Sequence, residues 1–166
     1  LLTRRQQAAF QRYYGTPDDR FILLPPPVSH ERRRPADAAA VRSAFRAEHG
    51  LGDGDVVVLA LGSGFVTKGL DRTLRALAAL PPRLRDNVRL YVVGADKPGS
   101  FRALARRLGL LEQVTFFGGR DDAQRFLLGA DLLLHPAYSE SGGIVLLEAM
   151  IAGLPVIATA ACGFAP

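Results

Sequence analysis

The chain has 166 residues, of which 48% are hydrophobic and 22% charged, enough for one globular domain with a substantial core. Its net charge of +5 permits phosphates, acidic lipid surfaces or nucleic acid as partners, or simply a surface of solvated arginines. The single cysteine, Cys162, excludes an internal disulfide and fits a reducing compartment. Charged residues interrupt every long apolar stretch, which excludes a transmembrane helix, and no signal peptide is recognised.

The beginning of the chain is predicted to be the end of one unit followed by a connector. Thr3 and Gln6 form a plausible capping box for a first helix. A short apolar run, residues 21–24, stops at three prolines, which favour a stiff connector and place a domain boundary across residues 25–35. Within it, residues 30–34 are expected to form a solvated, charged loop. Because the chain starts without methionine and stops just after a strand, we expect it to be part of a longer protein.

From residue 36 onward, apolar strands alternate with amphipathic helices. The predicted strands cover residues 56–61, 88–93, 114–117, 132–135 and 155–159. The predicted helices cover residues 36–49, 71–80, 100–108, 121–128 and 144–152. Continuous apolar strands without hairpin signals predict an α/β fold, a Rossmann-like doubly wound parallel sheet with helices on both faces. In such a sheet the ligand lies outside the carboxyl ends of the strands, so the loops that follow the strands are the candidates for a site.

The loop after the first strand, GSGFVTKG, begins with Gly62 and Ser63 and carries Lys68 near its end. Its glycines allow close backbone approach, and Lys68 brings a cation to the place where a diphosphate would lie. It is neither a Walker A loop nor the dinucleotide fingerprint, because Lys68 precedes a glycine and Thr67 stands where the fingerprint needs one. The loop is therefore either a phosphate site or an ordinary turn with a surface lysine.

The loop after the third strand, GGRDD, contains Gly119 and Arg120. The guanidinium of Arg120 could lie against a base or reach a phosphate, and Asp121 is a natural N-cap for the next helix. An ordinary loop with an exposed arginine explains the same residues equally well.

The stretch from the fourth to the fifth strand combines an anion site with two acids. Gly142 and Gly143 precede a helix, and the amino end of a helix attracts an anion through its free N–H groups and its dipole. Glu140 and Glu148 flank that helix start and would repel a bare phosphate. They fit a ligand that also has hydroxyl groups, since an ionised carboxylate only accepts hydrogen bonds. A sugar nucleotide has both parts, whereas the alternative is two ordinary surface carboxylates.

Other kinds of site find little support in the sequence. Three histidines and one cysteine at unrelated spacings make no metal site, and we assign a structural role to His135 at the end of the fourth strand. The nucleophile-elbow pattern G-x-S-x-G is missing. Net charge alone suggests nucleic-acid binding, without an aromatic-basic motif to accompany it.

The pair Glu140 and Glu148, with glycines between them, resembles the E-x7-E motif of retaining glycosyltransferases with the GT-B fold. The resemblance extends over nearly the whole chain, through LLPPPV, GSGFVTKGLDR, VTFFGGRDD and ADLLLHPAYSESGGIVLLEAMIAGLPVIAT in the family's order. It implies that residues 1–24 end an acceptor domain, residues 25–35 link the domains, and residues 36–166 form a donor-binding domain truncated at its C-terminus. The chain departs from the family at Ser63 and Gly64, where many members have an arginine, and at Pro27.

The resemblance also implies a role for each matching residue. The donor is a nucleotide sugar, with no metal and no separate cofactor expected. Glu148 would bind the ribose, Glu140 would face the transferred sugar, and Lys68 would neutralise the diphosphate. The remaining implied contacts are the uracil with Gly119 and Arg120, the phosphates with Gly62 and Ser63, and the distal phosphate with the backbone of Ser141, Gly142, Gly143, Ile144 and Val145.

Within the family, the segments LLPP, KGLDR and GIVLLEA are most similar to enzymes that transfer glucose from UDP-glucose to a heptose of the lipopolysaccharide core. This similarity implies a peripheral enzyme at the cytoplasmic face of the bacterial inner membrane, inactive without its acceptor domain. Two alternatives keep the fold, namely a sugar-nucleotide epimerase or hydrolase and a non-catalytic module that binds a nucleotide sugar. A nucleic-acid module is a further alternative and predicts steeply salt-dependent binding.

Overall fold

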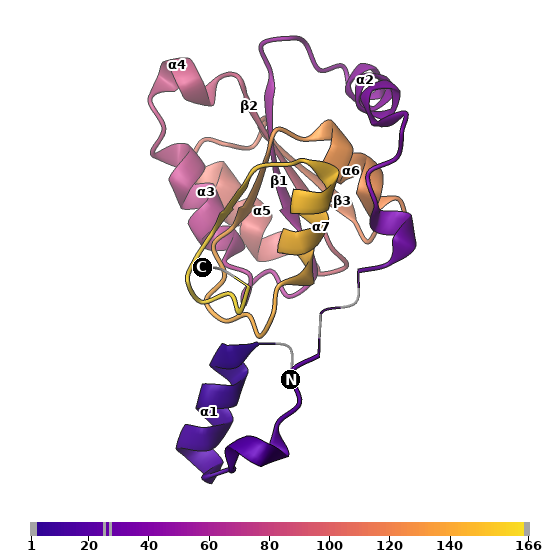
Figure 1. Cartoon of the computed structure of the whole chain (residues 1–166). Coiled ribbons are helices and arrows are strands. Elements are labelled where there is room, and N and C mark those ends of the chain that lie inside the picture. Colours follow the sequence, from indigo (N-terminus) through magenta and orange to yellow (C-terminus); the bar gives the residue numbers. More distant parts are fainter. Residues whose placement is uncertain (1–2, 25, 27, 165–166) are drawn as a thin grey trace.

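The computed structural model describes residues 3–24, 26 and 28–164, and its body is one parallel β-sheet between two layers of helices (Figure 1). The strands are β1 (Val56–Leu61), β2 (Val88–Val93), β3 (Val114–Gly118), β4 (Leu132–His135) and β5 (Val156–Ala158). They lie in the order β3-β2-β1-β4-β5, and every pairing between neighbours is parallel. The predicted doubly wound parallel sheet is therefore confirmed. The chain turns to opposite sides of β1 when it forms β2 and β4, so the topological switch point lies between β1 and β4.

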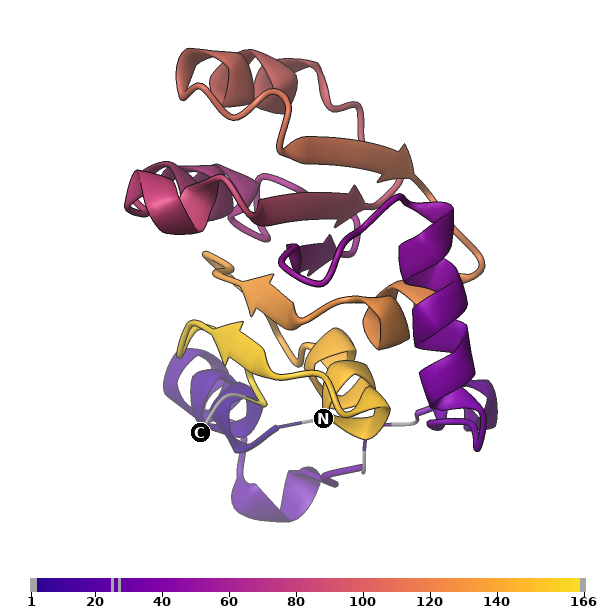
Figure 2. The same cartoon turned by 90° about the horizontal axis from the view of Figure 1, so that it is seen from above.

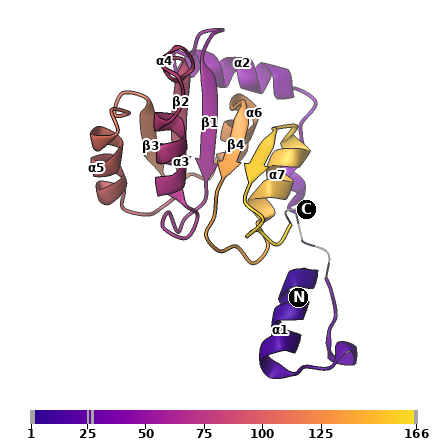
Figure 3. The ribbon, with the colours of Figure 1, turned by 90° about the vertical axis from the view of Figure 1, so that its left-hand side faces the viewer.

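Helices cover both faces of the sheet, as Figures 2 and 3 show from two further directions. The helices of the body are α2 (Ala38–Glu48), α3 (Leu70–Ala78), α4 (Pro82–Arg85), α5 (Gly99–Arg107), α6 (Ala123–Gly129) and α7 (Ile144–Ala152). Alternate side chains of β1 enter two separate cores: Val57 and Leu59 pack with α2, α6 and α7, whereas Val58 packs with α3 and α5. Burial of each such side chain contributes about 1.5–3 kcal/mol, which fixes the strands whose ends carry the site.

The helix at the beginning of the chain, α1 (Arg4–Tyr14), stands away from the sheet (Figure 1). The predicted capping box is confirmed, because the Thr3 hydroxyl accepts from the backbone N–H of Gln6 and the Gln6 side chain accepts from the N–H of Thr3. None of the helix's own residues is buried, and Arg5 donates to the carbonyl of Ala160. The helix is thus anchored through its first turn, next to the last described residues of the chain.

Two local predictions need correction. Residues 30–34 are charged and mostly exposed as expected, but they are not all loop, because His30–Arg32 form a 3-10 helix and Arg32 contacts Glu148. One short helix was not predicted: Pro82 begins α4 at a position that needs no N–H. Asp122 rather than Asp121 occupies the N-cap of α6, without a capping hydrogen bond from its side chain. Pro25 and Pro27 of the predicted connector lie outside the described residues.

Among the helices of the described residues, none is long and apolar enough to cross a bilayer. This agrees with the charges that interrupt the apolar stretches of the sequence.

Candidate functional site

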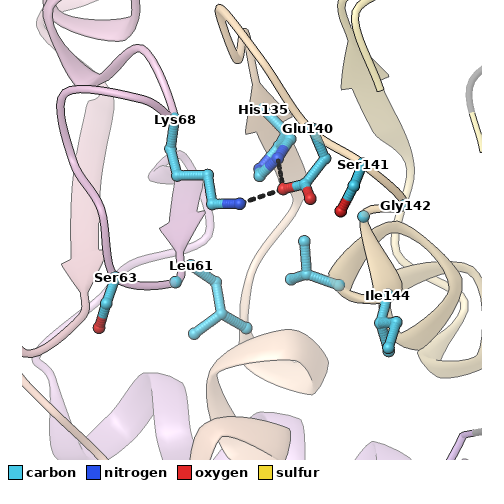
Figure 4. A pocket seen from close by; sticks show the side chains of 11 residues that line it. Leu61, Ser63, Lys68, His135, Glu140, Ser141, Gly142 and Ile144 are labelled. Atoms are coloured by element: carbon cyan, nitrogen blue, oxygen red, sulfur yellow. Dashed lines mark hydrogen bonds and ion pairs between the residues drawn. The ribbon is translucent and has the colours of Figure 1, made fainter. Parts of the chain in front are cut away.

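A cavity of about 360 Å³ opens at the switch point, where the carboxyl ends of β1 and β4 meet the start of α7 (Figure 4). Its lining is Leu61, Gly62, Ser63, Lys68, His135, Glu140, Ser141, Gly142, Gly143, Ile144 and Val145. All the predicted site residues are therefore together here, except Gly119, Arg120 and Glu148. The agreement follows from topology, because parallel strands place the loops after them at one edge of the sheet.

The β1–α3 loop can carry Lys68 over the cavity because it packs tightly against the loop after β4. A Cβ atom on Gly69 would lie 2.2 Å from the carbonyl oxygen of Pro136, and the φ of Gly69 is +73°. The N–H of Tyr138 donates to the carbonyl of Thr67 at 2.9 Å. Only glycine allows this approach at position 69, and the approach brings Lys68 close to the acid on the neighbouring loop.

The other end of the β1–α3 loop is held by the loop after β2. The Ser63 hydroxyl accepts from the N–H of Ala95 at 3.0 Å, and Asp96 accepts from the N–H of Gly64 at 2.7 Å. Ser63 thus supports the loop from its first turn. The sequence did not indicate Asp96, because its contact depends on the pairing of β1 with β2.

Lys68 and Glu140 form an ion pair inside the cavity (Figure 4). The Glu140 side chain is only 11% exposed, whereas Lys68 is 29% exposed. Burial raises the pKa of Glu140, but the hydrogen bond and charge of Lys68 outweigh that effect, so its pKa lies below the ordinary value. Glu140 is consequently an ionised acceptor at neutral pH, and its cation remains accessible to a ligand.

His135 is a lining residue to which the sequence assigned only a structural role. It ends β4, its side chain is almost fully buried, and its Nε2 atom lies 3.4 Å from Oε2 of Glu140. Burial lowers the pKa of His135, and the nearby carboxylate only partly opposes this. The imidazole is therefore neutral at pH 7 and packs against the Lys68–Glu140 pair. Its position at the carboxyl end of a central strand was the signal that could have identified it.

The start of α7 forms the opposite wall of the cavity. Gly143 occupies the N-cap with a φ of +93°, and no side chain caps the helix. No side chain of the N-cap residue therefore accepts from the N–H groups of the first turn, which begins with Ile144 and Val145. The preceding loop is fixed from behind, because Gly163 and Phe164 donate backbone N–H groups to the carbonyls of Glu140 and Gly142. Such an uncapped helix start is suited to an anion.

Arg120 and Gly119 do not line this cavity. They border a separate open hollow with Asp121 and Asp122. Two hydrogen bonds of 2.8 Å join the Arg120 guanidinium to the Asp122 carboxylate, which raises the pKa of Arg120. For the predicted contact with a base or phosphate, the Arg120 guanidinium would have to break its hydrogen bonds with Asp122 or bind the ligand while keeping them.

Glu148 also lies outside the lining, although it is on α7. Its Oε1 atom is 3.4 Å from Nε of Arg32, and its side chain is 19% exposed. This carboxylate inside an apolar helix therefore has a partner within the chain itself. The sequence missed it, because the two residues are far apart in the chain.

No group of three or more potential metal ligands occurs in the part of the chain that the structure describes. The charged groups of the cavity are instead one lysine, one glutamate and the start of a helix. This combination can hold an anion and hydroxyl groups at the same time.

Comparisons with known proteins agree with this arrangement. The protein-family profile described as "Glycosyl transferases group 1" matches residues 41–166. The lipopolysaccharide glucosyltransferase WaaG of Escherichia coli (strain K12) is 48% identical over 165 residues, which are 99% of this chain and 44% of that protein. A D-inositol 3-phosphate glycosyltransferase of Streptomyces scabiei (strain 87.22) is 34% identical, over 97% of this chain and 38% of the relative.

Solved structures give the same result. The crystal structure of WaaG, a glycosyltransferase involved in lipopolysaccharide biosynthesis, superposes with a TM-score of 0.93 at 47% identity, covering 99% of this chain and 45% of that one. The Anabaena protein HepE in complex with UDP and glucose superposes with a TM-score of 0.82 at 26% identity, covering 97% and 44%. The chain therefore spans less than half the length of these relatives.

Proposed function

The chain belongs to the glycosyl transferase group 1 family, and from this premise we propose that its cavity binds UDP-glucose as a glycosyl donor. The observation that carries the proposal is the cavity itself, where Lys68, the uncapped start of α7 and Glu140 converge. The relative HepE, which has the same fold, was crystallised with UDP and glucose. We assign residues 36–166 to the donor-binding domain and residues 25–35 to the linker.

The proposed pose places the diphosphate between Lys68 and the start of α7. Before the donor binds, the ammonium of Lys68 is paired with Glu140. A diphosphate offers that ammonium a second, stronger negative charge, so Glu140 becomes available to accept from hydroxyls of the glucose. The ribose would extend toward Glu148 and the uracil toward Gly119 and Arg120, beyond the lining of the cavity.

The chemistry required of this domain is to stabilise the leaving group. As the bond between glucose and UDP breaks, negative charge develops on the diphosphate, and Lys68 and the helix start lie where they would meet it. In the family's route the acceptor attacks from the same face within an ion pair, so the configuration is retained and no protein nucleophile is assigned. Glu140 and Lys68 are accordingly the proposed catalytic residues, and neither role requires a metal.

For the longer protein we propose the activity of the relative WaaG, transfer of glucose to a heptose of the lipopolysaccharide core. Such an acceptor is anchored in lipid, so the enzyme would work as a peripheral protein at the cytoplasmic face of the inner membrane. The 48% identity over nearly the whole chain supports this assignment. The acceptor site would belong to the additional length that the relatives have.

Calorimetric titration of the 166-residue chain with UDP-glucose, ADP-glucose and UDP-N-acetylglucosamine tests the donor proposal. We expect saturable binding of all UDP compounds, tightest for UDP-glucose, and no consumption of donor without an acceptor. Failure of every nucleotide sugar to bind would refute the proposal. Slow conversion of UDP-glucose alone, followed by NMR, would instead identify an epimerase or a hydrolase.

A further inference from the structure

Three consecutive arginines, residues 32–34, are each held by α6 or by α7, the helix that forms one wall of the cavity. We call them the arginine segment. Arg32 contacts Glu148 in α7, the carbonyl of Arg33 accepts from Gln124 in α6 at 2.5 Å, and Arg34 donates to the carbonyl of Ala152 at the end of α7. The segment therefore belongs structurally to the donor domain, although helix α2 separates it from β1 in the chain.

The anchoring of the segment is specific to its position along α7. Gly153 lies directly beside this guanidinium, since a Cβ atom on Gly153 would be 2.6 Å from Nη1 of Arg34. The negative end of the helix dipole also favours a cation there. With Arg34 fixed at the end of the helix, Arg32 is held beside its middle, where Glu148 is the one charged residue of α7.

The Arg32–Glu148 pair is partly withdrawn from water, since the two side chains are 28% and 19% exposed. A carboxylate has about four lone-pair sites, so a contact to one guanidinium leaves acceptor capacity for hydroxyl groups of a ligand. Without the guanidinium, the Glu148 side chain would be free to rotate, and a ligand would have to immobilise it on binding. Arg32 removes that cost in advance.

We propose that Arg32 is a positioning residue of the nucleotide site, which holds the Glu148 carboxylate ready for the ribose hydroxyls of the donor. The inference rests on the proposed function, which places the ribose at Glu148. It extends the nucleotide site to the segment that links the domains. Arg32 acts through Glu148 and need not touch the ligand itself.

A double-mutant cycle in UDP binding tests the inference with the whole 166-residue chain. We expect Arg32→Ala to weaken UDP binding about threefold to fivefold, the range of a partly exposed ion pair. Glu148→Ala should weaken it about tenfold or more, as expected for lost hydrogen bonds to a charged group. The double variant should bind like Glu148→Ala alone, because Arg32 has no effect once its carboxylate is gone. Arg32→Lys should recover part of the loss.

Arg33→Ala is the matched control, because it removes a neighbouring exposed arginine and keeps the backbone carbonyl that Gln124 uses. We expect its UDP affinity to equal that of the unmodified chain. Thermal unfolding of each variant checks that binding is compared between folded proteins.

The second arm replaces UDP by 2′,3′-dideoxyuridine diphosphate, which lacks the ribose hydroxyls. We expect the effects of Arg32→Ala and Glu148→Ala to vanish with this probe, which a merely structural role of Arg32 would not produce. Additive effects in the cycle, tighter UDP binding by Arg32→Ala, or an equal loss with both probes would overturn the inference while donor binding stands. A chain that does not bind UDP at all would overturn the proposed function as well.

Discussion

Two carboxylates lie at opposite ends of β4 and share the same chemistry, yet their surroundings differ. Asp131 precedes the strand and Glu140 follows it, and each is paired with cations and has a pKa below its ordinary value. Asp131 meets Arg42 at 2.5 Å and Arg46 at 3.1 Å, and it accepts from the N–H of Val57 at 2.8 Å. It thereby joins α2 to the edge where β1 and β4 begin.

The two clusters differ in how many of their charged groups remain available to a ligand. Arg42 also donates to the last carbonyls around α6, and Arg46 donates to the carbonyls of Gly52 and Asp55. A hollow of about 340 Å³ adjoins Asp131, but its arginines, Arg34 and Arg42, are already committed to backbone carbonyls and to Asp131. Lys68 faces an open cavity with one carboxylate and a positive helix start. A saturated cluster stabilises the fold, whereas an incomplete one can receive a ligand.

The largest effect should come from breaking the saturated cluster. Asp131→Ala leaves two guanidinium groups and the N–H of Val57 without their shared acceptor, so we expect a loss of about 2–3 kcal/mol in the free energy of unfolding. Asp131→Asn should lose less, since an amide oxygen can still accept from Val57. Urea unfolding measures both. If the folded Asp131 variants also lost UDP affinity, the idea that the cluster at the start of β4 serves only stability would be wrong.

Acid titration provides an independent check on the same cluster. Burial raises the pKa of Asp131. The hydrogen bond from Val57 and the two arginines lower it by more than burial raises it, so the pKa in the folded chain lies below that in the unfolded chain. The stabilisation is complete above the unfolded pKa near 4 and is lost as the pH falls through the folded pKa. Asp131→Ala should therefore flatten the acid limb of the stability curve.

Breaking the incomplete cluster should change binding more than stability. Lys68→Met removes the one lysine of the cavity, and we expect UDP affinity to fall about tenfold to a hundredfold, the range of a charge-assisted contact. The free energy of unfolding should fall by at most about 1–2 kcal/mol: Lys68 is partly exposed, but its loss leaves the nearly buried Glu140 carboxylate without its cation. Calorimetry and urea unfolding give the two values.

Lys97→Met is the matched control for that substitution. Lys97 is the other lysine of the chain and lies exposed in the loop after β2, at the same edge of the sheet. It should leave UDP affinity unchanged. Equal losses from both variants would mean that net charge, rather than the placement of Lys68, attracts the nucleotide.

Much of this arrangement was predictable, because short-range patterns determine it. β1, β2, β4 and α7 have the predicted bounds, since each is an apolar run that ends at glycine, proline or a polar residue. The cavity followed from the strand order, which places the loops with Lys68 and Glu140 at one edge. α4 was not predicted, although its first residue, Pro82, is of a type that is favourable in the first turn of a helix.

Two of the contacts that sequence reasoning missed, those of Arg32 and His135, depend on tertiary placement. The pairing of Arg32 with Glu148 requires the linker to fold back along α7, and no local pattern encodes that path. In the sequence His135 is an ordinary strand residue, and only the fold shows that it lies beside Glu140. Arg120 was assigned to the nucleotide, but its neighbour Asp122 holds it in the structure. Which charges are satisfied within the chain therefore decides which remain for a ligand.

The smallest effect we expect concerns His135, which lies in the cavity beside Glu140. Burial lowers its pKa, Glu140 opposes the shift, and Lys68 adds to it, so the folded value lies below the ordinary 6.5. At a pH between the folded and the unfolded pKa of His135, the imidazole is protonated in the unfolded chain and neutral in the folded chain. Stability should therefore decline as the pH falls below 6.5, with a slope of at most about 1.4 kcal/mol per pH unit.

His135→Gln should remove this slope, whereas His30→Gln should retain it because His30 is exposed to solvent. Urea unfolding at a series of pH values measures the slope for each protein. A slope that survives His135→Gln would assign the proton to another group. It would also mean that burial does not hold the pKa of His135 below its ordinary value.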